Sequence, residues 1–412
     1  MEVKKMKKLL AMLLVLAMIS CLFVACANND SETDAPTTAP TDESKTNEST
    51  DNSDATEPDD NNGDVKIAMI TDYGDITDQS FNQTTYEACK AFAEDNSIEF
   101  NYFKPVGDNT ADRVAMIEKA VDEGYNVIVM PGYAFGGAIV ETAPKFSDVK
   151  FIALDVSAGD LGDGFEVPDN LYCAVYQEEL CGYMAGYAAV KMGYTKLGFL
   201  GGMAVPAVVR YGYGFVQGVD AAAAETGTEN VTLNYVYGGQ FFGDADITAV
   251  MDTWYQHDGV EVVFACGGGI YTSAVDAAKK ADAKVIGVDV DQAGVIANYA
   301  ETEGMTITSA MKGLYPTTYD TLSDVILNDN WSKYAGQIAT LGLVSADDPE
   351  ANYVQIPMGD GTQWCDTFTQ DDYKAMVKAM YDGELTVSND ITKSPADFAT
   401  CIAVEDQGAI KG

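Results

Sequence analysis

Polar residues and glycines follow most of the apolar runs in this chain, and their types could recognise a small ligand. In open parallel sheets, ligands bind beyond the carboxyl ends of the strands, so residues at those ends are candidates for a binding site. The same residue types also form turns and cap helices, and each one taken alone fits that structural role as well. The candidates are Asp72, Asp155, Phe242, Asp244, Gly267, Gly268, Gly269, Asp289, Asp291 and Lys312.

Patterns that carry catalysis are nearly absent from the sequence. The one histidine, His257, excludes multi-histidine metal sites, and no GxGxxG, GxxxxGK[ST] or GxSxG motif occurs. Asp72, Asp75 and Asp78 are similar to the calcium-binding loops of nucleoside hydrolases, but they lack the spacing of an EF-hand loop. The glycine run that begins at Gly267 could cradle a phosphate, yet no lysine follows it to complete a P-loop. We therefore expect no enzyme activity, no metal and no cofactor.

Short apolar runs alternate with helical segments from residue 64 onward. Residues 65–71 and 100–103 are typical of strands, and residues 110–124 form an amphipathic helix pattern that Thr110 opens and Gly124 closes. This alternation predicts parallel sheets with right-handed crossovers. The sequence contains about ten strand candidates, which is more than one ordinary doubly wound sheet contains. We therefore expect an α/β fold of two Rossmann-like lobes joined by crossing hinge strands.

Charge and composition exclude several functions. The 64 acidic residues outnumber the 24 basic ones, which gives a net charge of -40. This acidity argues against binding to nucleic acid and to an anionic membrane surface, because both need clustered lysine and arginine. Apolar residues make up 47% of the chain, enough for a sizeable core.

The N-terminal region predicts export and lipid anchoring. Residues 1–25 join four lysines to an apolar run, which indicates a secretory signal peptide. The run ends in Val24, Ala25 and Cys26, which resembles a bacterial lipobox and predicts diacylglycerol on Cys26; the alternative is an uncleaved helical anchor. Residues 26–63 are acidic and polar, so we expect a disordered tether that holds a folded domain outside the cell membrane.

Six cysteines remain beyond Cys26, and none belongs to a CxxC pair, which excludes a zinc ribbon or a thioredoxin-like site. Several of them lie inside apolar runs, where free buried cysteine is ordinary, so the sequence assigns no disulfide.

Six motifs, in order along the chain, resemble the basic membrane protein family of substrate-binding lipoproteins. They are ITDYGDITDQSFNQ (70–83), QEELCGYMAGYAA (177–189), GFLGG (198–202), FFGDADIT (241–248), VIGVDVDQ (285–292) and ITSAMK (307–312), and YDGELTVSND (381–390) resembles the closing segment of the family. The resemblance implies a type I periplasmic-binding-protein fold, as in the purine nucleoside receptor.

The resemblance implies aromatic residues on both sides of a nucleoside base. Phe81 and Phe242 match the positions that sandwich the base, and Phe241 is the alternative to Phe242 because the loop offers two aromatic side chains. Asn82 matches a position that binds the ligand or orients its loop.

The resemblance also implies the polar contacts. Asp72 and Asp155 match positions that meet the edge of the base, and Asp289 matches an acceptor for the ribose hydroxyls. Lys312 matches a donor to a ribose oxygen and can also pair with a neighbouring acid. Gly269 falls where the backbone must approach the sugar closely.

By this resemblance the chain is the extracytoplasmic binding lipoprotein of a bacterial ABC importer, a membrane-tethered monomer that delivers a nucleoside to a permease. One lobe is expected from residues 64–176 plus about 312–345, and the other from 177–311 plus part of the C-terminal segment to 412. Three alternatives stay open. The fold could bind a sugar, since aromatic rings also stack on pyranoses; the chain could be a nucleoside hydrolase; or it could be a signalling receptor.

Overall fold

The computed structural model describes residues 65–411. The expected signal peptide, the lipidated Cys26 and the acidic tether lie outside these residues. Between residues 65 and 411, no helix is both long and apolar enough to cross a membrane.

The first sheet has six parallel strands, in the order β11-β5-β4-β3-β1-β2. Its central strands are continuous apolar runs with nearly every residue buried, as expected for strands covered by helices on both faces. The strands are β1 (Lys66–Ile70), β2 (Glu99–Phe103), β3 (Val127–Pro131), β4 (Lys150–Leu154), β5 (Leu171–Tyr176) and β11 (Gln337–Leu341).

The second sheet has seven strands, in the order β12-β10-β9-β8-β6-β7-β13. All neighbours are parallel except β10 and β12, which pair in the antiparallel sense. The strands are β6 (Lys196–Gly201), β7 (Thr232–Tyr237), β8 (Val262–Cys266), β9 (Lys284–Asp289), β10 (Thr306–Lys312), β12 (Val354–Gln355) and β13 (Ala403–Ala409).

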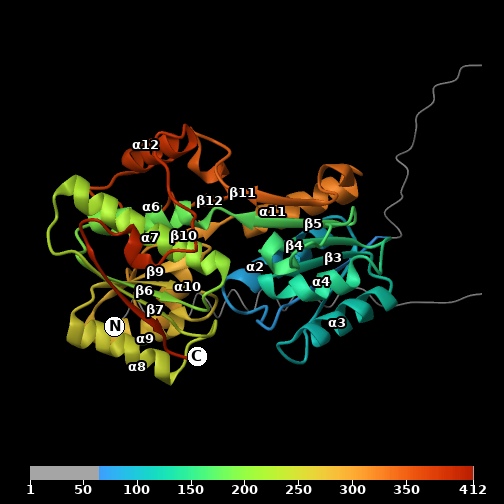
Figure 1. Cartoon of the computed structure of the whole chain (residues 1–412), viewed down its shortest axis with the longest axis horizontal. Coiled ribbons are helices and arrows are strands. Elements are labelled where there is room, and N and C mark those ends of the chain that lie inside the picture. The colour runs from blue at the N-terminus through green and yellow to red at the C-terminus, as the bar shows by residue number, and fades with distance from the viewer. Residues whose placement is uncertain (1–64, 412) are drawn as a thin grey trace, which may run out of the picture. The chain divides into compact units, whose positions relative to one another are not determined.

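Helices connect the strands and cover the sheets (Figure 1). The two α/β sheets confirm the fold class expected from the alternation of apolar runs and helical segments. The helices are α2 (Phe81–Asp95), α3 (Thr110–Asp122), α4 (Gly136–Thr142), α5 (Ala158–Leu161), α6 (Glu178–Lys191), α7 (Pro206–Thr226), α8 (Ala245–Thr253), α9 (Tyr271–Ala281), α10 (Ala293–Ala300), α11 (Leu314–Leu322) and α12 (Gln370–Tyr381).

Helices α6 and α7 pack unusually closely because glycines lie at their contact. A Cβ atom on Gly218 of α7 would lie only 2.1 Å from the carbonyl oxygen of Tyr183 in α6, and one on Gly214 would lie 2.1 Å from the carbonyl oxygen of Glu179. This contact places the start of α6, with Glu178, beside Arg210 of α7.

The chain crosses between the two sheets three times: after β5, between β10 and β11, and between β11 and β12. The crossing segments also bond to one another. The Gln177 N–H donates to the Leu341 carbonyl at 2.9 Å, and the Gly313 N–H donates to the Tyr353 carbonyl at 2.7 Å. The carboxyl ends of both sheets therefore meet at these crossings.

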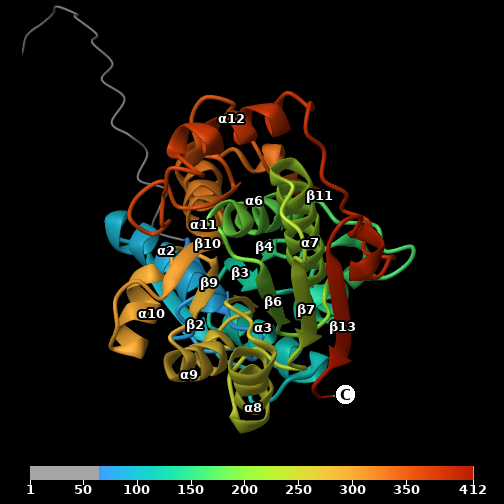
Figure 2. The ribbon, with the colours of Figure 1, turned by 90° about the vertical axis from the view of Figure 1, so that its left-hand side faces the viewer.

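The last part of the chain adds structure that the sequence pattern did not predict. Strands β12 and β13 join the second sheet, with β13 beside β7 at its edge (Figure 2). The sequence of β13, AVEDQGA, is mostly exposed and has no alternation of apolar and polar residues. All six cysteines between residues 65 and 411 are unpaired.

Candidate functional site

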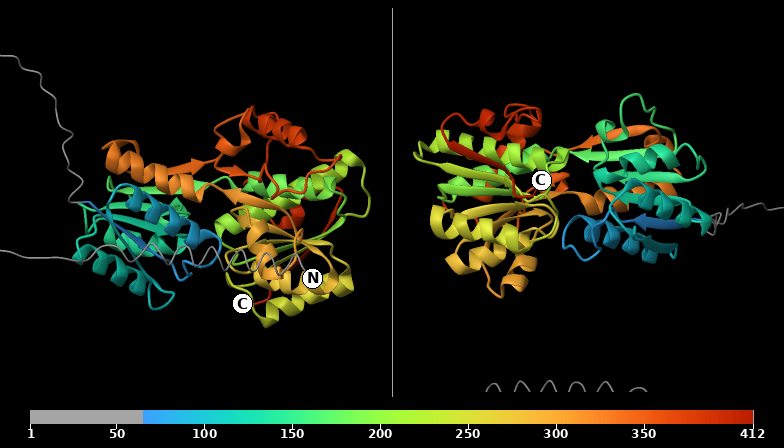
Figure 3. Two further views of the ribbon diagram at one scale, coloured as in Figure 1. Left: turned by 180° about the vertical axis from the view of Figure 1, so that it is seen from behind. Right: turned by 60° about the horizontal axis from the view of Figure 1, so that its bottom comes forward.

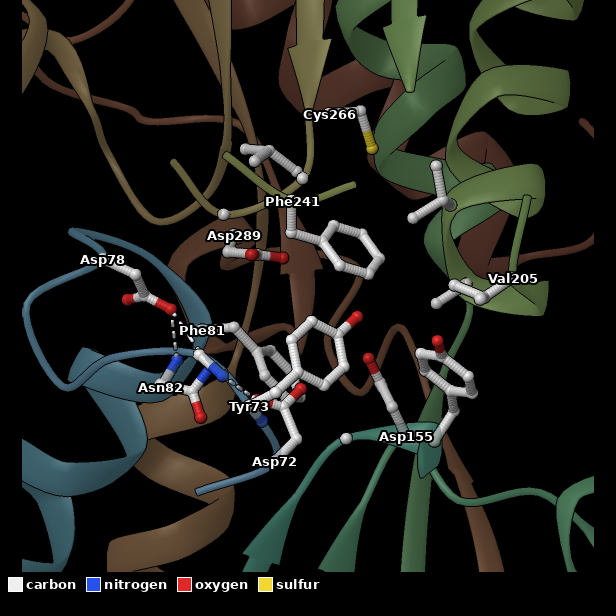
Figure 4. A pocket seen from close by; sticks show the side chains of 18 of the residues that line it. Asp72, Tyr73, Asp78, Phe81, Asn82, Asp155, Val205, Phe241, Cys266 and Asp289 are labelled. Carbon is white, nitrogen blue, oxygen red and sulfur yellow. Dashed lines mark hydrogen bonds between the residues drawn. The ribbon is translucent and has the colours of Figure 1, made fainter. Parts of the chain in front are cut away.

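A cavity of about 360 Å³ lies where the carboxyl ends of the two sheets meet (Figure 4). Its volume falls in the range of about 300–1,000 Å³ that is typical of small-molecule sites. Its wall includes all eight residues expected from the sequence, brought together from six strand ends and the start of α2: Asp72, Phe81, Asn82, Asp155, Phe242, Gly269, Asp289 and Lys312.

Asp72 follows β1 and lies at the base of the cavity with only 7% of its surface exposed. One carboxylate oxygen accepts the backbone N–H groups of Tyr73 and Gly74, both at 2.6 Å. Burial raises the pKa of Asp72, while these backbone hydrogen bonds and the charge of Arg113 lower it. Gly132, with φ +124°, lets the end of β3 approach the other carboxylate oxygen.

The two other acids of the D-x-x-D-x-x-D motif have separate partners. Asp75 pairs with Lys104 at 2.8 Å. Asp78 caps the start of α2, because its carboxylate accepts the N–H groups of Ser80, Asn82 and Gln83 at 2.9–3.0 Å. All three acids of the motif line the cavity, but Asp75 is held in an ion pair and Asp78 in a helix cap.

Asn82 is held in place by this cap. Its side-chain amide donates to Asp78 at 3.2 Å, which leaves its amide oxygen, Oδ1, buried in the cavity wall without a hydrogen-bond partner among residues 65–411.

Lys312, at the end of β10, lies at the centre of a buried cluster of charges. Its ammonium group is 2.5 Å from Asp155, 3.5 Å from Glu178 and 3.8 Å from Asp289. Burial lowers the pKa of Lys312, but the three carboxylates raise it by more, so the ammonium stays protonated. Burial raises the pKa of Asp155, although Lys312 partly offsets that effect. Glu178 also accepts from the Nε of Arg210 at 2.6 Å.

Asp289 connects the ends of the two sheets. It ends β9 with φ +66°, a left-handed conformation that turns its carboxylate toward the cavity. That carboxylate accepts the hydroxyl of Ser80, which precedes α2, at 2.5 Å and the hydroxyl of Tyr211 at 3.3 Å.

Aromatic rings line the cavity. The ring of Phe81 lies against Lys312, whose ammonium is 4.7 Å from the ring centroid. The rings of Phe241 and Tyr73 face one another across the cavity with centroids 6.3 Å apart, and Figure 4 shows the Phe241 side chain directed into it. Phe242 lies at the rim with 59% of its surface exposed. The structure therefore favours Phe241 over Phe242 as the ring that lies inside the cavity. The sequence had left Phe241 as the alternative to Phe242.

The glycine run after β8 makes room for Phe241 and contacts its loop. A Cβ on Gly267, where φ is +147°, would lie 2.8 Å from the Phe241 ring, and a Cβ on Gly202 would lie 2.3 Å from it. Gly269 donates its N–H to the Phe241 carbonyl at 2.9 Å. The run thus has a clear role in positioning an aromatic side chain.

One further buried acceptor lines the cavity. Asp155 has one carboxylate oxygen, Oδ1, without a hydrogen-bond partner among residues 65–411. A buried acceptor left unpaired costs about 1–3 kcal/mol, so this oxygen, like the Oδ1 of Asn82, favours a ligand that donates hydrogen bonds.

Sequence reasoning missed several residues of the site. Tyr73 and Tyr133 line the cavity, and their hydroxyls approach the sulfur of Met203 at 3.5 and 3.7 Å, which joins the ends of β1, β3 and β6. Tyr73 directly follows Asp72, so the strand-end rule could have identified it. Glu178 begins α6 and Arg210 lies within α7. No sequence pattern distinguishes these two residues from surface charges.

Comparison with known proteins identifies a protein family that this chain matches. A family model described as "ABC transporter substrate-binding protein PnrA-like" matches residues 65–346. A protein of Lactococcus lactis named "ABC transporter nucleoside-binding protein BmpA" is 26% identical over 242 residues, 56% of this chain and 65% of that protein, so the match spans just under two thirds of its length. Basic membrane protein B of Borreliella afzelii is 28% identical over 285 residues, 68% of this chain and 78% of that protein.

The fold also matches a solved structure. An ABC transporter solute-binding protein from Aeropyrum pernix K1 superposes with a TM-score of 0.61 at 20% identity, covering 81% of this chain and 90% of that one. This likeness supports the two-sheet fold that the strand order shows.

Proposed function

The chain belongs to the PnrA-like family of ABC transporter substrate-binding proteins, also called basic membrane proteins, and we propose that its ligand is a purine nucleoside. The family consists of transport proteins rather than enzymes, and its members bring a small ligand to a permease.

The observation that carries the proposal is the pairing of aromatic walls with unpartnered acceptors in one cavity. Phe81 and Phe241 offer apolar faces to a flat ring, and stacking on an aromatic side chain is worth about 1–3 kcal/mol per base. The free oxygens of Asn82 and Asp155 accept hydrogen bonds, which suits the N–H groups of a purine and the hydroxyls of a ribose. The name of the Lactococcus relative supports the same class of ligand.

The charges of the cavity favour a neutral ligand over a phosphorylated one. The two cations of the buried cluster, Lys312 and Arg210, already pair with carboxylates, at 2.5 and 2.6 Å. A nucleotide phosphate would have to displace these carboxylates or lie beside them, and like charges in a buried site are costly.

The proposed mechanism is closure of two lobes around the ligand, without chemistry. We assign one lobe to the first sheet with its helices and the other to the second sheet with its helices. Contacts such as Ser80 with Asp289 and Asp155 with Lys312 join them, and the crossing segments act as the hinge. Closure removes water from the cavity and strengthens each polar contact with the ligand. Diacylglycerol on Cys26 would tether the protein beside its permease.

The test is a thermal-shift panel of nucleosides, nucleotides, free bases and sugars on purified protein that was unfolded and refolded to remove carried-over ligand. A ligand at 100 times its dissociation constant stabilises the folded state by about 2.7 kcal/mol. We expect a shift with inosine, guanosine or adenosine that is absent with their monophosphates and lost in Phe81→Ala. Phe146→Ala, a partly buried residue of the core beside α4, is the control. A shift with sugars alone would replace the ligand class, and a shift with monophosphates would contradict the charge argument.

A further inference from the structure

We propose that Lys411 and strand β13 latch the aromatic loop, residues 238–244, so that Phe241 is held ready for the ligand. The effect on ligand affinity rests on the proposed function, whereas the effect on the loop itself does not. The segment that supplies this latch lies beyond residue 346, where the family match ends.

Strand β13 runs along β7, the strand that leads into the aromatic loop (Figure 2). Three contacts away from the loop fix it there. The carboxylate of Asp220 accepts the N–H groups of Thr400 and Cys401, both at 2.8 Å, and the indole N–H of Trp254 donates to Gln407 at 3.1 Å. The strand is therefore anchored independently of the loop that follows β7.

The chain continues past β13 directly alongside the loop. The Ile410 N–H donates to the carbonyl of Tyr237, the last residue of β7, at 2.8 Å. Gly239, with φ +80°, allows close approach, because a Cβ at that position would lie 2.8 Å from the Lys411 side chain. In both views of Figure 3, this end of the chain lies on the side of the second sheet that faces the first.

Lys411, Gln240 and Asp244 form a triangle of polar side chains beside the two aromatic residues, Phe241 and Phe242. Its ammonium pairs with Asp244 and donates to the side-chain oxygen of Gln240 at 3.1 Å. Gln240 in turn donates to Asp244 and to the Phe242 carbonyl, both at 2.9 Å. The residues at the two ends of the Phe241–Phe242 segment are thus tied to one another and to the end of the chain.

Asp244 also anchors the loop to α8, since its carboxylate accepts the N–H groups of Asp246 and Ile247 at 3.0 Å. Lys411 is the member of the triangle that belongs to neither the loop nor α8. Its removal should free the loop without breaking the cap of the helix.

The latch positions Phe241 without touching the ligand. The Phe241 ring fits against Gly202 and Gly267 and faces Tyr73, so a small shift of the loop would move it off these surfaces. A loop ordered before binding loses less conformational entropy on binding, which favours affinity.

The experiment compares Lys411→Met, Lys411→Arg and the control Lys378→Met by amide hydrogen exchange without ligand and by titration with inosine. Lys378, in α12, forms an exposed ion pair at 2.5 Å with Asp382, the residue that follows the helix, and belongs to neither the loop nor β13. We expect faster exchange in residues 238–244 and an affinity about two- to five-fold weaker in Lys411→Met, as for a partly exposed ion pair. The difference should shrink at high salt. Lys411→Arg should restore both properties, and Lys378→Met should change neither.

The two proposals fail in different ways. If the unaltered protein binds inosine and Lys411→Met neither exchanges faster nor binds more weakly, the latch is refuted. Faster exchange with unchanged affinity refutes the positioning of Phe241. If the unaltered protein binds no nucleoside, the proposed function fails, and equal exchange in the unliganded variants would then refute the latch on its own.

Discussion

Replacing Lys312 with methionine should destabilise the folded protein strongly at neutral pH. The side chain of Lys312 is 3% exposed, and its ammonium lies within 3.8 Å of three carboxylates, those of Asp155, Glu178 and Asp289. Methionine has similar length and no charge, so the change isolates electrostatics from packing.

The size of the effect follows from these distances. One ion pair at about 4 Å contributes about 4 kcal/mol at an effective dielectric constant of about 20, and desolvation of each ion offsets much of this. Breaking a buried pair by removing one partner typically costs about 3–5 kcal/mol, because a charge stays buried and unpaired. We expect the free energy of unfolding to fall by that amount.

The loss should grow with pH. Burial already raises the pKa of Asp155, and Lys312 lowers it, so loss of the lysine raises that pKa further. The folded variant then binds a proton that the unfolded chain releases above the ordinary pKa of 3.8, so its stability falls as pH rises. Near pH 5 the protonated carboxyl limits the penalty.

Urea denaturation at about pH 5 and about pH 7.5 measures both quantities. The double variant Lys312→Met/Asp155→Asn should recover part of the loss, because it removes the acid closest to the missing ammonium. The control Lys378→Met, which breaks an exposed ion pair, should leave the free energy of unfolding nearly unchanged. A loss below about 1 kcal/mol for Lys312→Met, or an equal loss at both pH values, would refute the electrostatic reasoning.

Three further results are expected. Phe241→Ala should weaken nucleoside binding by about 1–3 kcal/mol in calorimetric titration, and Phe242→Ala should weaken it less; equal losses would contradict the assignment of the inner ring. Burial raises the pKa of Glu179 from 4.5 to about 7, so the folded state is favoured below pH 4.5 and loses about 3 kcal/mol as pH rises to 7. Urea denaturation of Glu179→Gln should show that this slope has gone, and an unchanged slope would count against the burial argument. Gly218→Ala should destabilise by about 1–3 kcal/mol, because its Cβ would lie 2.1 Å from a carbonyl oxygen of α6. Gly294→Ala, in open space, should stabilise by up to about 1 kcal/mol, and similar unfolding midpoints for the two would argue against close packing of α6 and α7.

The strand-end residues show what sequence pattern can predict about this site. Asp72, Asp155, Asp289 and Lys312 each follow or end an apolar run. Because parallel strands place their carboxyl ends at one edge of a sheet, residues far apart in sequence converge there without any knowledge of side-chain packing. The alternation of strands and helices predicts the two-sheet fold for the same reason, since buried strands need apolar residues on both faces.

Contacts within irregular loops could not be predicted from the sequence pattern. Phe241 and Phe242 are neighbours in a loop with no periodic pattern, and the space beside Gly202 and Gly267 decides which ring enters the cavity. The partners of Glu178 were equally hidden, because Arg210 reaches it only through the close packing of α6 on α7.

Strand β13 shows the difference between what the sequence determines and what only the tertiary structure decides. Its sequence is charged and exposed, so local preference does not predict a strand, and its hydrogen bonds with β7 supply the stability instead. The sequence alone determined the fold class, the family and the strand-end residues Asp72, Asp155, Asp289 and Lys312 of the cavity, because these follow from local periodicity and short motifs. Only the tertiary structure decided the inner aromatic ring, the charge cluster around Lys312 and the contacts of Lys411 with the aromatic loop, because each depends on atoms brought together by packing over long sequence distances.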